Sequence, residues 1–520
     1  MTTELDRQNG RAASGHWDQP AAADPGATKS SAREPGRTSG SHARRRGNLL
    51  SRSPAWPLVT LLVGYPLWWA MGIADYMFIL LAIPMAVRLY SWRAQGRRLL
   101  RLPPGFSLWL LFLICMLAGA ATLGLTAPGT IASPLGNRII AFGDRGASYL
   151  AVTILLVFAG NLTERELPRR RLAWLLGLVG IYAIIGGFAG IIAPTFEFTS
   201  PLALVMPKSF QNNTLVQSML HPALTQVQGV LGQAEGRPKA PFDYTDSWGD
   251  SLTILLPWLL VAWWTTRKQR RKAIVVAVLA LVPLIYSLDR GVWIGMAVSV
   301  MYLAVRFAAR GRLGPLAAIG SGLAVVGIIV LVSPLHGLIS ARLTSEQNSN
   351  SIRASLNALA VRDARASPLI GYGDERHQQG SAASIAVGPT ASCSACGQAE
   401  AGSTGQLWLL LVSDGFLGAV LYLSFFAYGI WRYRRDMSPY GLAGVLVLLL
   451  TFVYMFTYEA VVAPLAFTML AYALLWRNDI QLRSPDPDPD PERGPESIEE
   501  AAANGPHGSR RRAATSRART

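Results

Sequence analysis

The feature that most constrains this chain is its series of long apolar segments, most of them separated from the next by a short polar stretch. Hydrophobic stretches of about 18 residues or more with few charges are candidate transmembrane helices. We count twelve such segments, at about 56–71, 74–90, 106–125, 145–161, 172–193, 250–266, 273–288, 292–308, 315–333, 405–430, 439–457 and 462–476.

The composition agrees with a membrane protein. Of the 520 residues, 51% are hydrophobic and only 15% are charged, whereas soluble globular proteins carry about 25% charged residues. The sequence therefore predicts an all-α polytopic membrane protein with about twelve transmembrane helices.

The orientation follows from the loops in which Lys and Arg collect, because cytoplasmic loops carry the excess. With the N-terminus inside, the basic segments 93–101, 163–171, 267–272, 306–312 and 431–436 all lie on the inner side, and the short outer turns near 72–75 and 458–464 carry no Lys or Arg. We therefore expect a protein of the cytoplasmic membrane with both termini in the cytoplasm. This topology and the basic tails account for the net charge of +17, so nucleic-acid binding is not expected.

The chain divides into a membrane domain at 54–478 and two tails. Residues 1–53 are rich in Gly, Ser, Ala and Arg without apolar periodicity, which predicts a disordered cytoplasmic tail. Residues 479–520 include the acidic run PDPDPDP and a basic end, and we expect disorder there too. The basic ends either contact anionic membrane lipids or remain solvated.

Two long segments fall on the predicted outer side, at 194–249 and 334–404. Each contains a stretch with helical amphipathic periodicity, at 214–231 and at 351–366, which predicts short helices lying at the outer membrane surface. Residues 374–404 lack such periodicity, and we expect them to form a flexible lid.

Arginines are frequent in these outer segments, contrary to the usual loop bias. In SLDRGVWIG (287–295), Asp289-Arg290-Gly291 forms the predicted outer hairpin between two spans. The planar guanidinium suits phosphate oxygens, so an arginine cluster at head-group level indicates an anionic ligand such as a lipid-linked diphosphate. The alternative is that each arginine anchors its loop to lipid phosphates. The candidate ligand-binding residues are Arg237, Arg290, Arg342, Arg353 and Arg362.

Three segments on the outer side resemble the superfamily of O-antigen ligases and Wzy-type polymerases, over about 55–478. GRPKAPFDYTDSWG (236–249) resembles the arginine-containing segment that leads into a helix, and SLDRGVWIG resembles the Ser-Arg-Gly hairpin. RASLNALAVRDARASPLIGYG (353–373), followed by GSTGQLWLLLVSDGFLGAVLYLSFF (402–426), is similar to the outer helix, the Pro-Leu-x-Gly-x-Gly turn and the glycine-containing helix of that family.

The resemblance implies a reaction on the outer face of the membrane. Members of this superfamily transfer a glycan from a polyprenyl-diphosphate carrier to a glycan or lipid acceptor, generally without a metal or cofactor. Arg290 and Arg353 match the positions of the family's catalytic arginines, and Arg237 matches the arginine before the helix. Positive donors aimed at the leaving diphosphate are the main catalytic requirement.

The general base is less defined. Family ligases carry a His-Asn pair where this chain has Ser403-Thr404-Gly405-Gln406, which favours a polymerase-type or divergent activity. Asp246, His377 and Glu400 are the available outer substitutes. Asp246 is our candidate catalytic base, and its alternative role is to cap the following helix.

Two other function classes stay open at this point. The chain could be a membrane transporter for a lipid-linked sugar, although transporters place ionisable groups at the bilayer midplane and these segments are nearly free of charge there. It could also be a non-catalytic scaffold of envelope assembly.

Overall fold

The computed structural model of the chain describes residues 53–96, 98–130, 134–207, 216, 219–229, 234–332, 337, 347–377, 400–460 and 462–483. These residues belong to one compact unit within Leu50–Thr520. Helices account for 73% of them, so the all-α prediction is confirmed in its main part. Residues 1–52 and 484–520 of the predicted tails, and 378–399 of the predicted lid, lie outside the described residues. The predicted start of the C-terminal tail at 479 is wrong, because residues 479–483 continue helix α18 (Ala463–Arg483), where the Asp479 carboxylate pairs with Arg432 and Arg483.

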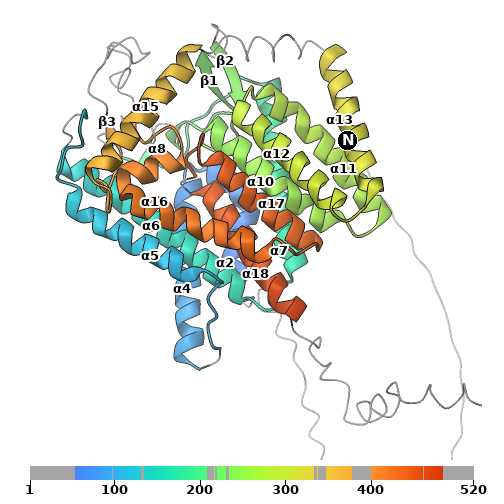
Figure 1. Cartoon of the computed structure of the whole chain (residues 1–520), viewed down its shortest axis with the longest axis horizontal. Coiled ribbons are helices and arrows are strands. Elements are labelled where there is room, and N and C mark those ends of the chain that lie inside the picture. Colours follow the sequence, from blue (N-terminus) through green and yellow to red (C-terminus); the bar gives the residue numbers. More distant parts are fainter. Residues whose placement is uncertain are drawn as a thin grey trace, which may run out of the picture. The chain divides into compact units, whose positions relative to one another are not determined.

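The helices follow the chain in the order shown in Figure 1. The first seven are α2 (Trp56–Val63), α3 (Tyr65–Ala70), α4 (Ala74–Ala94), α5 (Phe106–Ala118) with the 3-10 turn η1 (Gly119–Thr122), α6 (Leu135–Asn161), α7 (Arg169–Ile192) and α8 (Leu202–Val205). The others are α10 (Thr245–Trp263), α11 (Arg267–Tyr286), α12 (Arg290–Ala308), α13 (Leu313–Val332), α15 (Gln347–Ala366), α16 (Gln406–Tyr433), α17 (Pro439–Tyr454) and α18 (Ala463–Arg483).

Five of these helices are long and apolar enough to cross a membrane, namely α4, α6, α7, α12 and α16. Three shorter apolar helical segments accompany them, at Phe106–Thr122, Leu313–Val325 and Pro439–Tyr454. The protein is therefore membrane-embedded and mostly helical. Each of the twelve apolar segments identified in the sequence coincides largely with helix, and the count of twelve spans stays a prediction.

The loops predicted to lie on the inner side contact one another. Arg98, from the loop after α4, forms a bidentate ion pair with Glu166, from the loop before α7. Its Nη1 and Nη2 atoms donate to the two carboxylate oxygens at 2.8 and 2.9 Å. Arg306, in the last turn of α12, donates to the carbonyl oxygen of Asp436 at 2.7 Å. The segments predicted to lie outside likewise meet, as described below for the candidate site.

Close packing of α7 against α10 fixes the helix that carries the candidate site. A Cβ atom on Gly177 of α7 would lie 2.8 Å from the Cα atom of Leu259, and one on Gly180 would lie 3.3 Å from the Cβ atom of Leu255. Small residues allow helix backbones to approach in this way. The indole nitrogen of Trp248 then donates to the carbonyl oxygen of Ala183 at 2.9 Å, which sets the depth of α10.

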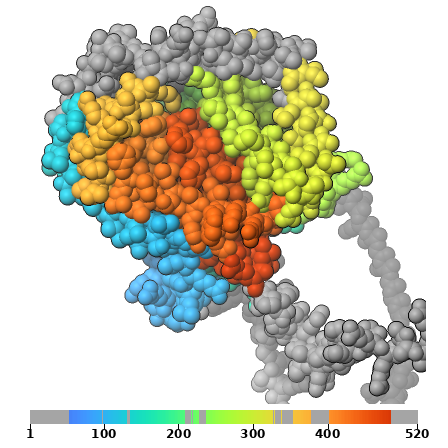
Figure 2. All heavy atoms as spheres, viewed as in Figure 1, coloured from blue at the N-terminus to red at the C-terminus, as the bar shows by residue number. Residues whose placement is uncertain are grey.

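Helix α16 is broken at Gly415, whose φ of 68° and ψ of −171° lie in a region open essentially to glycine alone. The turn Pro368–Gly373 fills the break. Tyr372 N–H donates to Val412 and Gly373 N–H to Ser413, both at 2.8 Å, so the turn satisfies carbonyl groups that the break leaves open. Figure 2 shows α15, which leads into this turn, lying against α16.

One predicted amphipathic helix is confirmed and the other is partly wrong. In α15, Leu356, Leu359 and Ala360 are buried on one face, as the periodicity of 351–366 indicated. Within 214–231, however, Thr225–Gly229 is strand β1, which pairs antiparallel with β2 (Ala234–Pro238). Thr and Val alternate with Gln in TQVQG, a two-residue period that suits a strand. A second two-residue pair joins β3 (Arg376–His377) to β4 (Glu400–Ala401).

The break in α16 gives a test of this packing. We expect Gly415→Ala to lower the free energy of unfolding by about 1–3 kcal/mol, because alanine is strained in that backbone region and its Cβ would lie 2.7 Å from the carbonyl oxygen of Pro368. Thermal unfolding of the detergent-purified protein measures the effect. Gly143→Ala in α6 is the control, since nothing lies within 4 Å of its Cβ. Equal Tm values for the two variants would contradict the account.

Candidate functional site

The candidate site is built around Arg237, in strand β2. Its side chain is 6% exposed, and its Nε donates to the carbonyl oxygen of Ser287 at 2.7 Å. Its Nη2 lies 3.6 Å from Oδ1 of Asp246 and 3.5 Å from Oδ2 of Asp289. One guanidinium therefore connects the hairpin β1–β2, the start of α10 and the turn between α11 and α12.

The β-hairpin places this arginine. Gln226 lies opposite Arg237 in the register, and its side-chain oxygen accepts from the N–H of Thr245 at 3.0 Å. The Thr245 hydroxyl in turn donates to the Arg237 carbonyl oxygen at 3.3 Å. The strand that sequence reasoning missed is thus tied to the first turn of α10, and it presents Arg237 to the carboxylates.

A tight turn joins α11 to α12, as predicted, but it lies at Ser287–Asp289 and not at Asp289–Gly291, because Arg290 and Gly291 already belong to α12. Leu288 has a positive φ of 53°, and the Asp289 carboxylate accepts from Gly291 N–H at 3.0 Å. Asp289 is thus the N-cap of α12. The Tyr458 hydroxyl donates to Asp289 and accepts from Val292 N–H at 3.1 Å. Gly291 makes room for this ring, because a Cβ there would lie 2.2 Å from the Tyr458 oxygen.

Asp246 is half-buried in the first turn of α10, before the predicted span 250–266. Tyr244 is the N-cap and no side chain caps this helix, so the capping role considered for Asp246 is wrong. Partial burial and the neighbouring Asp289 carboxylate raise the pKa of Asp246 to about 6, while the charges of Arg237 and Arg353 lower it. Such a carboxyl is ionised at neutral pH and is suited to proton transfer.

Two further predicted residues reach the same place. Arg353 is exposed on α15 and donates to the carbonyl oxygen of Thr457 at 3.2 Å, and its charge acts on Asp246. Arg290 is the first residue of α12, next to the Asp289 cap. The structure therefore brings together Arg237, Asp246 and Arg353, from β2, α10 and α15, and Arg290 follows the Asp289 cap at the start of α12.

The other predicted residues are not part of this group. Arg362 lies nine residues beyond Arg353 on α15 and donates to the carbonyl oxygen of Pro128. Nine helical residues rise by about 14 Å, so Arg362 belongs to another part of the surface. Arg342 lies outside the described residues. His377 and Glu400, the alternative bases, are paired across β3 and β4.

Three further arginines, Arg138, Arg145 and Arg376, are buried and donate to backbone carbonyl groups. Arg138 donates to the carbonyl oxygens of Leu123 and Leu125 at 2.8 and 2.9 Å. Arg376 donates to that of Tyr372 at 2.6 Å, and Arg145 to that of Gly373. Their guanidinium groups hydrogen-bond to carbonyl groups of the segment that follows η1 and of the turn beside α16.

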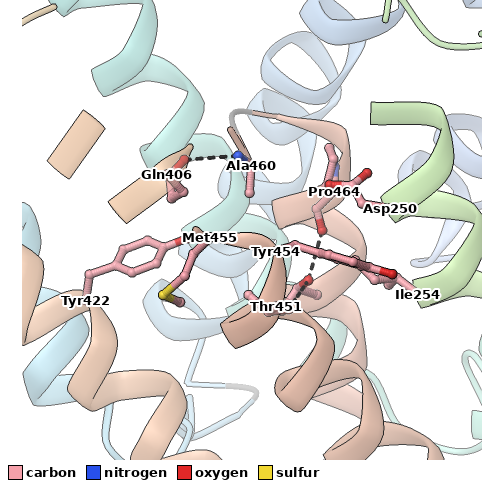
Figure 3. A pocket seen from close by; sticks show the side chains of 10 residues that line it. Asp250, Ile254, Gln406, Tyr422, Thr451, Tyr454, Met455, Ala460 and Pro464 are labelled. Carbon is pink, nitrogen blue, oxygen red and sulfur yellow. Dashed lines mark hydrogen bonds between the residues drawn. The ribbon is translucent and has the colours of Figure 1, made fainter. Parts of the chain in front are cut away.

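Gln406 stands near the position of the family's His-Asn pair and is fully buried. Its Nε2 donates to the Tyr149 hydroxyl at 2.9 Å, and its Oε1 accepts from Ala460 N–H at 3.1 Å (Figure 3). An amide bridging two neighbours cannot act as a base, so the structure assigns Gln406 a packing role. Tyr458 carried no motif that would have identified it in the sequence.

No group of three or more His, Cys, Asp or Glu side chains that could hold a metal is found within the described ranges. Comparison with protein-family models, with curated proteins and with solved structures gives no match for this chain. The properties of the site are therefore argued from its own geometry.

The hydroxyl of Tyr458 tests how this site is held. We expect Tyr458→Phe to destabilise the protein by about 1–3 kcal/mol, because it removes one hydrogen bond from the buried Asp289 carboxylate and leaves the Val292 N–H without its partner. The readout is thermal unfolding, with Tyr286→Phe as a control on a ring that is 38% exposed. Unchanged Tm in Tyr458→Phe would show that the Asp289 carboxylate does not depend on this bond.

Proposed function

We propose that this protein polymerises or ligates a polyprenyl-diphosphate-linked glycan at the outer face of the cytoplasmic membrane. In this proposal the twelve apolar segments all span the bilayer and both termini are cytoplasmic. The donor is the lipid diphosphate, the acceptor is a hydroxyl of a second glycan or lipid, and membrane lipids surround the site. The proposal rests on the resemblance of the three outer segments to the O-antigen ligase and polymerase superfamily and on the geometry at Arg237.

The observation that carries the proposal is the convergence of two arginines and a half-buried carboxylate at one end of the bundle. Arg353 is exposed on α15 and Arg290 begins α12, so both guanidinium groups can reach a ligand at head-group level. Their donors suit the oxygens of a leaving diphosphate. Arg237 is different, because its fork already holds two carboxylates and a carbonyl. We therefore assign Arg237 the role of positioning the Asp246 carboxylate.

Asp246 completes the arrangement as the general base. The acceptor hydroxyl attacks the anomeric carbon of the donor sugar, the bond to the diphosphate oxygen breaks, and the hydroxyl proton passes to the Asp246 carboxylate. The diphosphate leaves with the bonding electron pair, stabilised by Arg353 and Arg290. The second carboxylate, Asp289, shares Arg237 with Asp246 and keeps the pKa of Asp246 raised.

We expect Asp246→Asn and Arg353→Ala each to lower the rate of glycan transfer by roughly 100-fold, the scale of a lost base or a lost charge-stabilising donor. Arg290→Lys should fail nearly as badly as Arg290→Ala, because an ammonium group cannot replace the planar fork. The assay uses purified protein with a polyprenyl-diphosphate glycan and no nucleotide sugar. The rate of the wild type should also fall as the pH drops below about 6, since the base is then protonated.

Arg365→Ala is the matched control, because Arg365 is an exposed arginine of the same helix α15. Abundance in the membrane is measured beside activity for every variant. Full activity in Asp246→Asn and Arg353→Ala would reject the proposed chemistry. Absence of any transfer by the wild type, with normal abundance, would favour a transporter or a scaffold.

A further inference from the structure

An apolar segment on the predicted outer side follows directly after α7. The stretch FTSPLALVMP (198–207) contains no charged residue, and its middle forms the short helix α8. Leu204 and Val205 of this helix are 86% and 77% exposed, and Phe196, just before the stretch, is 52% exposed. Large apolar side chains that are exposed together, rather than singly, mark a surface that contacts a partner or a membrane.

Backbone hydrogen bonds hold this segment in a fixed course. Phe198 N–H donates to the carbonyl oxygen of Pro222 at 3.1 Å, and Ser200 N–H donates to that of Leu220 at 2.8 Å. Ser200 is also buried against the predicted outer turn between α3 and α4, where a Cβ atom on Gly72 would lie 2.6 Å from the Ser200 Oγ. The exposure of α8 therefore follows from the way in which the chain is held on both sides of it.

The neighbouring part of the chain is a candidate membrane span. α7 is one of the helices that are long and apolar enough to cross a membrane, and its residues Ile185 and Ile192, two turns apart, are both exposed. Phe196 follows Ile192 by four residues, so it lies within about 14 Å of the end of that helix. The exposed apolar surface of the span thus continues into the segment, which indicates that lipid covers both.

Aromatic rings indicate the depth of the segment in the membrane. The ring of Phe198 packs edge-on against Trp69 of α3, with 5.8 Å between the ring centroids, and it also contacts Phe196 at 6.1 Å. Tryptophan is enriched where acyl chains meet head groups. Apolar side chains beside such a ring suit insertion into the outermost part of the acyl region.

We propose that residues 196–206 form an interfacial anchor, which enters the outer leaflet without crossing the membrane. Phe196, Leu204 and Val205 insert among the acyl chains next to the head groups. This role goes beyond the proposed glycan transfer and does not require it.

The anchor and the β1–β2 hairpin are joined through the backbone. Leu224 N–H donates to the carbonyl oxygen of Phe196 at 3.1 Å, and β1 begins at the next residue, Thr225. Insertion of the anchor therefore sets the height above the membrane at which the hairpin holds Arg237.

The test measures how deeply nitroxide spin labels on single cysteines lie in the membrane. The full-length chain, with its three native cysteines replaced by serine, is reconstituted into vesicles of phosphatidylethanolamine and phosphatidylglycerol. Oxygen partitions into acyl chains and a nickel chelate stays in water, so the ratio of their collision rates with the label, measured by electron paramagnetic resonance, reports its depth.

We expect labels at Leu204→Cys and Val205→Cys to collide preferentially with oxygen. Ile185→Cys is the lipid control and should show a larger preference, because Ile185 lies about 10 Å deeper than the end of α7. Ala358→Cys, at an exposed position of α15, is the aqueous control and should favour the nickel chelate.

A ratio like that of Ala358→Cys at either α8 position would overturn the proposal. Slow collision with both reagents would overturn it as well, because a protein surface, such as a second copy of the chain, would then cover α8. Both α8 positions are exposed, so the two substitutions should leave Tm unchanged.

Discussion

The contacts of the buried Arg237 guanidinium hold this end of the molecule together. The guanidinium donates to the Ser287 carbonyl oxygen in the α11–α12 turn, and it faces the carboxylates of Asp246 and Asp289. Removing such a group leaves two carboxylates close together without compensation, which is far more costly than losing an exposed ion pair. The positions of Asp246, of the α12 cap and of Arg290 all follow from it.

The rest of the bundle supplies the rigidity that this arrangement needs. Glycines of α7 let α10 approach closely, and the turn Pro368–Gly373 satisfies the carbonyls opened by the break in α16. Backbone groups inside a bilayer must find partners within the protein, so a broken helix is tolerated only where another segment completes it. The same turn continues from α15, which brings Arg353 towards the ends of α10 and α12.

Apolar periodicity predicted the helices because burial in lipid depends on composition and length alone. It also predicted the buried face of α15 and the turn at Asp289. Strand β1 was missed because its alternating pattern covers only five residues inside a longer segment of mixed periodicity. Its strand conformation depends on pairing with β2, which the local sequence does not show. Arg362 was wrongly grouped with Arg353 because both were predicted to lie on the same side of the membrane. The nine residues that separate them along α15 were not considered.

The central claim is that the Arg237 group and Arg353 face the outer side of the membrane. The most direct test is side-specific labelling of single cysteines in a chain whose Cys115, Cys393 and Cys396 are replaced by serine. An exposed position on α15, Ala358→Cys, should react with an impermeant maleimide in intact cells, and Lys268→Cys at the start of α11 should react only after permeabilisation. Labelling of both from the same side, or of Lys268→Cys alone in intact cells, would contradict the account.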